Sequence, residues 1–209
     1  GVRRGAPLAL EGEEQEASTA ARFFGLELCS NSVAFVIDAS GSMKNRMLDP
    51  NGRWGSTSSR ATRYEVACEE LIRALRESPQ PMHFRVVLFS SSGHTMQTEA
   101  ELVSERAIQR TDMWLRRHQP DGGTFLATGL DRLLDPEDDD SLDELDVDTV
   151  VVLCDGETRE SATWANAWLE RWIADAPLVF HAVQIGGHRA AAIARLSEAT
   201  GGNFTRVGD

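Results

Sequence analysis

The chain has 209 residues, 41% of them hydrophobic, which suits one domain with a well-buried core. Its 33 acidic and 21 basic residues give a net charge of −12, which argues against nucleic acid and anionic membrane surfaces as partners. No apolar run reaches the roughly 18 residues of a membrane-spanning helix. The three cysteines show neither a disulfide framework nor zinc-ligand spacing.

Residues 1–22 are expected to form a polar linker or tail, followed by one domain over residues 23–209. The first segment has no regular pattern and carries four glutamates between positions 11 and 16, a composition typical of chain that does not pack into a core. The sequence starts with Gly1 and shows no signal-peptide pattern. We therefore expect a piece of a longer protein.

The first strand is predicted at residues 33–37, an apolar run typical of strands buried on both faces of a parallel sheet. Asp38, Ser40 and Ser42 follow directly, and Gly41 allows a turn tight enough to point both hydroxyls the same way. Oxygen groups of this kind hold hard divalent cations. Taken alone, an ordinary strand end that turns with Ser and Gly also explains the pattern.

A polar insert at residues 43–61 separates this motif from the next helix. It would lie beside a metal at the strand end, where Trp54 becomes a candidate for contact with a partner. A disordered surface loop is the alternative for so polar a stretch. The helix that follows shows an apolar stripe at helical spacing from Tyr64 to Leu75.

Two strands and a helix are predicted next. Residues 84–90 form a buried strand, and residues 93–98 follow it through a serine-rich turn as an antiparallel edge strand. A shorter helical stripe runs from Ala107 to Leu115.

The turn Asp121-Gly122-Gly123-Thr124 delivers a hydroxyl just before an apolar helix at residues 125–134. Spacing alone does not place Thr124 at the edge of the sheet. Its local alternative is an ordinary helix N-cap, which threonine favours.

Residues 136–148 hold eight acids but no glycine. A calcium loop needs a glycine at its turn, so a solvated charge run is the expectation. The valine-rich strand predicted at residues 147–154 then ends in Asp155-Gly156-Glu157. Because parallel strands bring their carboxyl ends to one edge, where ligands bind, Asp38 and Asp155 are predicted on the same rim.

The remaining chain continues the alternation, with helices near 162–175 and 189–200 and strands at 178–185 and, more weakly, 203–207. The first of these helices carries three tryptophans at helical spacing, which are expected to pack in the core rather than to form a partner surface. The alternation predicts an α/β fold: a Rossmann-like doubly wound, mostly parallel six-stranded sheet with one antiparallel edge strand and helices on both faces.

The three polar motifs together resemble a known family. Asp-x-Ser-x-Ser after the first strand, a Gly-Gly-Thr turn midway and a later strand-Asp-Gly-Glu are similar to the von Willebrand factor type A (vWA) domain, bacterial type, with a complete metal-ion-dependent adhesion site (MIDAS). The resemblance spans about Leu26 to Val207, and the motifs come in the order of the family. It implies hydroxyl ligands from Ser40, Ser42 and Thr124, with Asp38 and Asp155 acting directly or through bound water.

The resemblance implies a protein-binding module rather than an enzyme. A carboxylate from a protein partner would complete the shell of a divalent cation, Mg²⁺ first, with Mn²⁺ or Ca²⁺ as alternatives. Two aspartates offset the ion and hydroxyls add no charge, so the cation still attracts an anionic oxygen. Trp54, Gly123 and Glu157 are candidates for the partner-binding rim.

The compartment stays open. The segment Phe23-Phe24-Gly25 is similar to one in membrane-tethered bacterial members of the family, which is consistent with the soluble domain of such a protein.

Two alternative functions remain. A Mg²⁺-dependent phosphoryl-transfer enzyme, phosphatase-like, also places an aspartate at a strand end, but such sites generally use a lysine on a later strand. Lys44, the single lysine of this chain, lies in the first loop. The other alternative is a structural assembly subunit of a larger bacterial complex, in which a metal only stiffens the rim.

Overall fold

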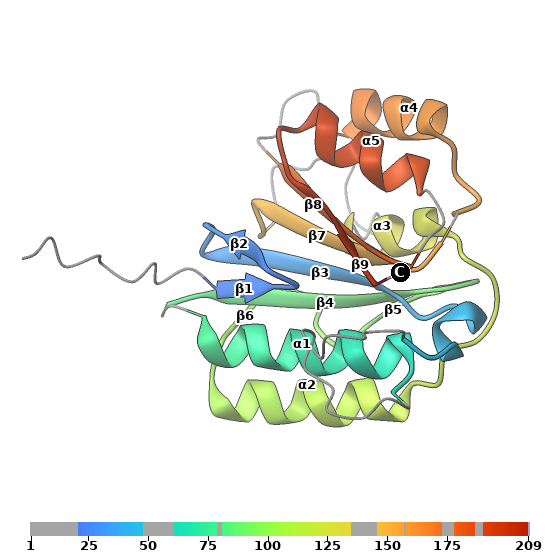
Figure 1. Cartoon of the computed structure of the whole chain (residues 1–209). Helices are drawn as coiled ribbons and strands as arrows, with labels where there is room; N and C mark the ends of the chain where they lie inside the picture. The colour runs from blue at the N-terminus through green and yellow to red at the C-terminus, as the bar shows by residue number, and fades with distance from the viewer. Residues whose placement is uncertain are drawn as a thin grey trace, which may run out of the picture.

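The computed structural model describes residues 21–47, 61–78, 81–134, 146–156, 158–172, 178–186 and 190–208. At its centre lies a mostly parallel β-sheet with helices on both faces (Figure 1). This confirms the Rossmann-like α/β fold that the alternation of strands and helices predicts.

The central sheet has seven strands within the described residues, in the order β5-β4-β3-β7-β8-β9 with β6 beside β4. Neighbours from β4 to β9 pair in parallel, whereas β5 and β6 pair antiparallel with β4. The additional strand relative to the prediction is β6, whose two residues are too short to show a strand pattern. The strands are β3 (Ser32–Asp38), β4 (His83–Phe89), β5 (Gly93–Thr95), β6 (Glu101–Leu102), β7 (Thr149–Cys154), β8 (Val179–Ile185) and β9 (Phe204–Val207).

The helices divide between the two faces of this sheet. In Figure 1, α1 (Arg63–Glu77) and α2 (Glu105–Arg117) cover one face, and the other three α-helices of the described residues lie on the opposite face. These three are α3 (Leu126–Leu134), α4 (Ala162–Trp172) and α5 (Ala191–Ala199). All five lie where the apolar stripes predict helices; residues 173–175 and 189 of the predicted ranges are outside the described residues.

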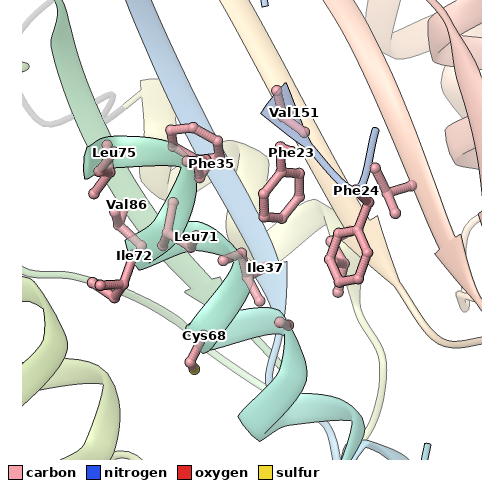
Figure 2. Close-up of a cluster of buried hydrophobic side chains, with 14 of the residues drawn as sticks. Phe23, Phe24, Phe35, Ile37, Cys68, Leu71, Ile72, Leu75, Val86 and Val151 are labelled. Atoms are coloured by element: carbon pink, nitrogen blue, oxygen red, sulfur yellow. The ribbon is translucent and has the colours of Figure 1, made fainter. Parts of the chain in front are cut away.

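Successive side chains of β3 feed two separate hydrophobic clusters, because side chains alternate between the faces of a strand. Phe35 and Ile37 pack with residues of α1, as Figure 2 shows, while Val36 lies against α3 in the second cluster, which also includes residues of α5. The tryptophans of α4 join the second cluster: Trp168 is buried, and Trp164 packs partly buried against it. Core packing, as predicted for this stripe, is confirmed.

A small hairpin precedes the sheet and was not predicted. Strands β1 (Ala21–Phe23) and β2 (Leu26–Leu28) pair with each other, and the fully buried Phe23 and Phe24 belong to the cluster under α1. The expected boundary between residues 22 and 23 falls inside β1. Strands of three residues are too short to show the alternation on which strand prediction relies.

Several predicted features lie outside the described residues. These are residues 48–60 of the polar insert, including Trp54, residues 136–145 of the acidic run, and Glu157. Of the helices that the structure describes, none is both long enough and apolar enough to cross a membrane.

Candidate metal centre

The two predicted aspartates lie on neighbouring strands at the point where the strand order reverses. From β3 the chain runs to β4 on one side, and it later returns to β7 on the other. Asp38 is the last residue of β3, and Asp155 directly follows β7. In open α/β sheets this reversal leaves a crevice at the carboxyl ends of the strands, so both carboxylates lie at the usual place for a ligand.

A short 3₁₀ helix, η1 (Gly41–Lys44), presents the serine hydroxyls to these carboxylates. The Ser40 amide donates to Asp38 Oδ1 at 2.7 Å. The hydroxyls of Ser40 and Ser42 lie 3.1 Å apart, and Ser42 Oγ donates to Asp155 Oδ1 at 2.8 Å. Four predicted ligands from two distant segments therefore form one connected cluster.

The turn that carries Thr124 lies against this cluster through its backbone. The Gly41 amide donates to the Gly122 carbonyl at 3.1 Å, and the Asp121 amide donates to the Ala39 carbonyl at 2.8 Å. Gly122 has φ +79°, and a Cβ there would lie 2.6 Å from Ser91 Oγ, so the turn requires glycine at this position. The structure thus brings the Gly-Gly-Thr turn to the same rim as the Asp-x-Ser-x-Ser motif.

Glu160, rather than Thr124, caps α3. Its carboxylate accepts the amides of Leu126 and Ala127, both at 3.0 Å. The residue before Glu160 also contacts this turn: the Arg159 amide donates to the Thr124 carbonyl at 3.0 Å. Thr124 is half-buried, and the ordinary N-cap role is filled by another residue.

The three rim candidates have different outcomes. Gly123 is half-exposed, and its amide donates to Ser91 Oγ at 2.9 Å, which fixes the turn against the end of β4. Trp54 and Glu157 lie outside the described residues. Partner contact by all three stays a prediction.

Asp38 is a buried carboxylate whose hydrogen bonds do not fully compensate the cost of burying its negative charge. Its side chain is fully buried, and burial raises its pKa to about 6 despite opposing hydrogen bonds from Ser40. The negative charge of Asp155 raises it further. The thiol of Cys154, whose own pKa burial raises, lies 3.3 Å from Asp38 Oδ2 as a weak donor. A cation at this position would relieve the cost of the buried charge.

One positive side chain already contacts the cluster. Arg63 Nη1 donates to Asp155 Oδ2 at 2.8 Å, and the two side chains are 17% and 1% exposed. The sequence motifs do not indicate this residue, because an arginine at the start of a helix is unremarkable by itself.

The donor chemistry fits a hard cation. Two carboxylates and neighbouring hydroxyls offer oxygen ligands only, as Mg²⁺ and Ca²⁺ prefer. Across the described residues there is no group of three or more His, Cys, Asp and Glu side chains that could hold a metal. Among the predicted ligands, the donors beside the two aspartates are the hydroxyls of Ser40, Ser42 and Thr124.

The rim also has an exposed charged part and a neighbouring cleft. Lys44 Nζ lies 3.7 Å from Asp121 Oδ1, with both side chains largely exposed. Beside this pair lies a cleft of about 580 Å³, lined among others by Lys44, Thr62 and His118. This lysine thus lies at the border of the crevice. A phosphoryl-transfer site would instead use a lysine on a later strand.

The model of the von Willebrand factor type A domain family matches residues 56–205. The chain belongs to this family. Comparison with curated proteins found no significant match. Domains of this family generally act as protein-interaction and adhesion modules.

Solved structures of other proteins share the fold. A von Willebrand factor type A protein from Catenulispora acidiphila superposes with a TM-score of 0.63 at 16% identity, covering 86% of this chain and 39% of that chain. The conserved hypothetical protein BatB from Bacteroides thetaiotaomicron gives a TM-score of 0.56 at 15% identity, covering 86% and 91%. The present chain therefore spans about two fifths of the first protein and nearly all of the second protein's solved chain.

A third neighbour bears on metals. Proximal thread matrix protein 1 from the mussel byssus, in a form with a zinc-occupied MIDAS motif, gives a TM-score of 0.53 at 16% identity, covering 85% of this chain and 41% of that chain. At identities this low, the structural likeness shows a common fold alone and says nothing of a metal in the present chain.

Proposed function

We propose that this vWA domain is a metal-dependent protein-binding module. Asp38, Ser40, Ser42, Thr124 and Asp155 would hold a divalent cation, and an acidic side chain of a protein partner would complete its coordination. The observation that carries the proposal is the chain of contacts from Asp38 through Ser40 and Ser42 to Asp155 at the reversal of strand order.

The chemistry of the donors favours Mg²⁺, with Mn²⁺ or Ca²⁺ as alternatives. Zinc prefers nitrogen and sulfur ligands, whereas the donors named here are all oxygens. Mg²⁺ also keeps open positions for water or a ligand oxygen. The zinc reported in the MIDAS of the mussel protein supports a cation at this place in the fold, not its identity.

The charge of the chain explains why binding would depend on the metal. At −12 the domain repels an acidic partner. Two positive groups at the rim, Arg63 and Lys44, are each already paired with an aspartate. A bound divalent cation would be the largest local charge and would reverse the field at the crevice.

Metal binding is tested first with the metal alone. Titration calorimetry with Mg²⁺ and Mn²⁺ should show one site in the wild-type domain. We expect Asp38→Ala to weaken it by more than the roughly 10- to 100-fold typical of groups that only support a ligand. Asp131→Ala is the control, since Asp131 is an exposed aspartate on α3. Equal affinities in wild type and Asp38→Ala would contradict the proposed site.

Partner binding is tested second, by capture from extracts of the source organism with Mg²⁺ and with EDTA. A partner retained in Mg²⁺ and lost in both EDTA and Asp38→Ala would support recognition through the metal. Circular dichroism should stay unchanged, because the hydrophobic clusters do not include the ligands. A metal that raises thermal stability while every partner persists in EDTA would favour the structural assembly subunit instead.

A further inference from the structure

Arg63 enters the site from a fixed position. It is the first residue of α1, directly after Thr62, whose side chain forms a capping box with Glu65. Its own amide donates to the Asn45 carbonyl at 2.9 Å, which ties the start of α1 to the segment after η1. The backbone of Arg63 is therefore held on both sides, and its side chain points towards Asp155.

The two oxygens of Asp155 have separate partners. Oδ1 accepts from the Ser42 hydroxyl, and Oδ2 accepts from Arg63 Nη1, both at 2.8 Å. The guanidinium thus occupies the oxygen that is turned away from the serine cluster. Arg63 and a cation at the cluster can share this carboxylate without competing for the same atom.

A glycine leaves room for the guanidinium. Gly186 follows β8, has φ +83°, and a Cβ there would lie 2.9 Å from Arg63 Nη2. A side chain at this position would displace the arginine. The Arg63 guanidinium therefore lies between two segments besides its own helix: the residue after β7, Asp155, and the residue after β8, Gly186.

The charge balance shows what Arg63 does to the site. Asp38 and Asp155 contribute −2, and Arg63 reduces the sum to −1 before any metal is present. A divalent cation then gives +1, where the two aspartates alone would give 0. Arg63 therefore repels the incoming metal, and it leaves the loaded site with an excess positive charge for an anionic ligand.

We propose that Arg63 is a permanent counter-ion of this site, which neutralises Asp155 in the metal-free domain and lowers the affinity for divalent cations. The inference rests on the proposed function, because it assumes that the cluster holds a metal. It makes Arg63 a positioning residue that sets how much free metal the domain requires before it can bind a partner.

The test separates the charge of Arg63 from its hydrogen bond. Arg63→Gln keeps a donor for Asp155 and removes the charge, whereas Arg63→Lys keeps the charge. Arg76→Gln is the matched control: Arg76 is exposed in the last turn of α1, about 20 Å along the helix, beyond the screening length at physiological salt.

Two measurements are made on all four proteins. Titration calorimetry with Mg²⁺ and Mn²⁺ should show a dissociation constant that is about tenfold lower in Arg63→Gln, because a like charge one carboxylate away has been removed. Arg63→Lys and Arg76→Gln should match wild type. In EDTA, the thermal midpoint of Arg63→Gln should fall by at least about 5 °C, since a buried carboxylate loses its counter-charge.

The outcomes distinguish this inference from the function on which it rests. Wild-type protein that binds neither ion would overturn the proposed function, and the inference with it. Wild-type protein that binds Mg²⁺ while Arg63→Gln shows the same or a higher dissociation constant would overturn the inference alone. A drop in thermal midpoint without a gain in metal affinity indicates a purely structural ion pair and likewise overturns it.

Discussion

The buried carboxylate of Asp38 is electrostatically unfavourable in its ionised form. A charged group in a low-dielectric position is costly unless it is compensated. Here the Ser40 amide donates to Asp38 Oδ1 at 2.7 Å, while the negative charge of the neighbouring Asp155 adds repulsion. The metal-free domain should therefore be less stable when Asp38 is ionised.

This cost predicts the pH dependence of stability in EDTA. The folded-state pKa of Asp38, about 6, lies above the ordinary value of 3.8, so between these values the folded protein binds more protons than the unfolded chain. The free energy of unfolding should then fall as pH rises, by about 2 kcal/mol between pH 4.5 and 7 from this residue. Urea unfolding of wild type and Asp38→Asn at both pH values measures the difference.

Asp38→Asn should lack this component, so its stability relative to wild type should rise by the same amount at pH 7. Saturating Mg²⁺ should remove the decline in wild type, because a cation compensates the ionised form. Parallel pH profiles of the two proteins in EDTA would show that Asp38 titrates as an ordinary carboxylate.

The sequence indicates the residues that carry the motif, but not those that support it. The motif residues lie at or just after the ends of two apolar runs, where the sequence pattern makes them visible: Asp38, Ser40, Ser42 and Asp155. Arg63 contacts a residue 92 positions away, and Glu160 caps a helix that begins 34 positions before it. Such contacts depend on how the elements pack, so no local sequence pattern predicts them.

At the scale of elements, the start of α3 joins two loops of the site. Glu160 accepts the first amides of the helix, and its neighbour Arg159 holds the Thr124 carbonyl. A negative charge at a helix N-terminus is favourable because the first amides lack partners within the helix. The Glu160 carboxylate therefore stabilises the start of α3, and it anchors the segment whose Arg159 amide holds the Gly-Gly-Thr turn.

Glu160→Gln should weaken both effects. The loss of charge at the cap should cost about 1 kcal/mol, a fall of about 2–4 °C in thermal midpoint for a domain of this size. Mg²⁺ affinity should fall several-fold, because the turn that carries Thr124 loses part of its anchor. Glu170→Gln, an exposed residue of α4, controls for the change in net charge. Unchanged Mg²⁺ affinity would show that this turn is positioned by other contacts.

The elements themselves were predictable to different degrees. Apolar patterns predict the longer elements: continuous apolar runs predict the buried strands β3 and β7, and an apolar stripe predicts α1. The short strands β1, β2 and β6 have no such pattern, because two or three residues cannot show a period. Strands β1 and β2 are held by mutual pairing and burial, and β6 by pairing with β4, and these contacts arise only in the folded chain.

At the scale of the molecule, the site and the two hydrophobic clusters are separate contributors to stability. The hairpin of β1 and β2 covers part of the cluster under α1, and Phe23 lies there with its ring 4.9 Å from Phe24 and 5.4 Å from Phe35 (Figure 2). Phe35 lies three residues before Asp38 on β3, about 10 Å along the strand.

This separation predicts that the hairpin stabilises the domain without tuning the metal site. Phe23→Ala removes a fully buried ring and should lower the free energy of unfolding by about 3–5 kcal/mol. Phe204→Ala, a half-exposed position on β9, should cost less. Since sites about 10 Å apart without common partners contribute independently, the Mg²⁺ dissociation constant of folded Phe23→Ala should match wild type. Urea unfolding and calorimetry measure the two quantities, and a several-fold change in Mg²⁺ affinity would instead mean that β3 transmits packing under α1 to Asp38.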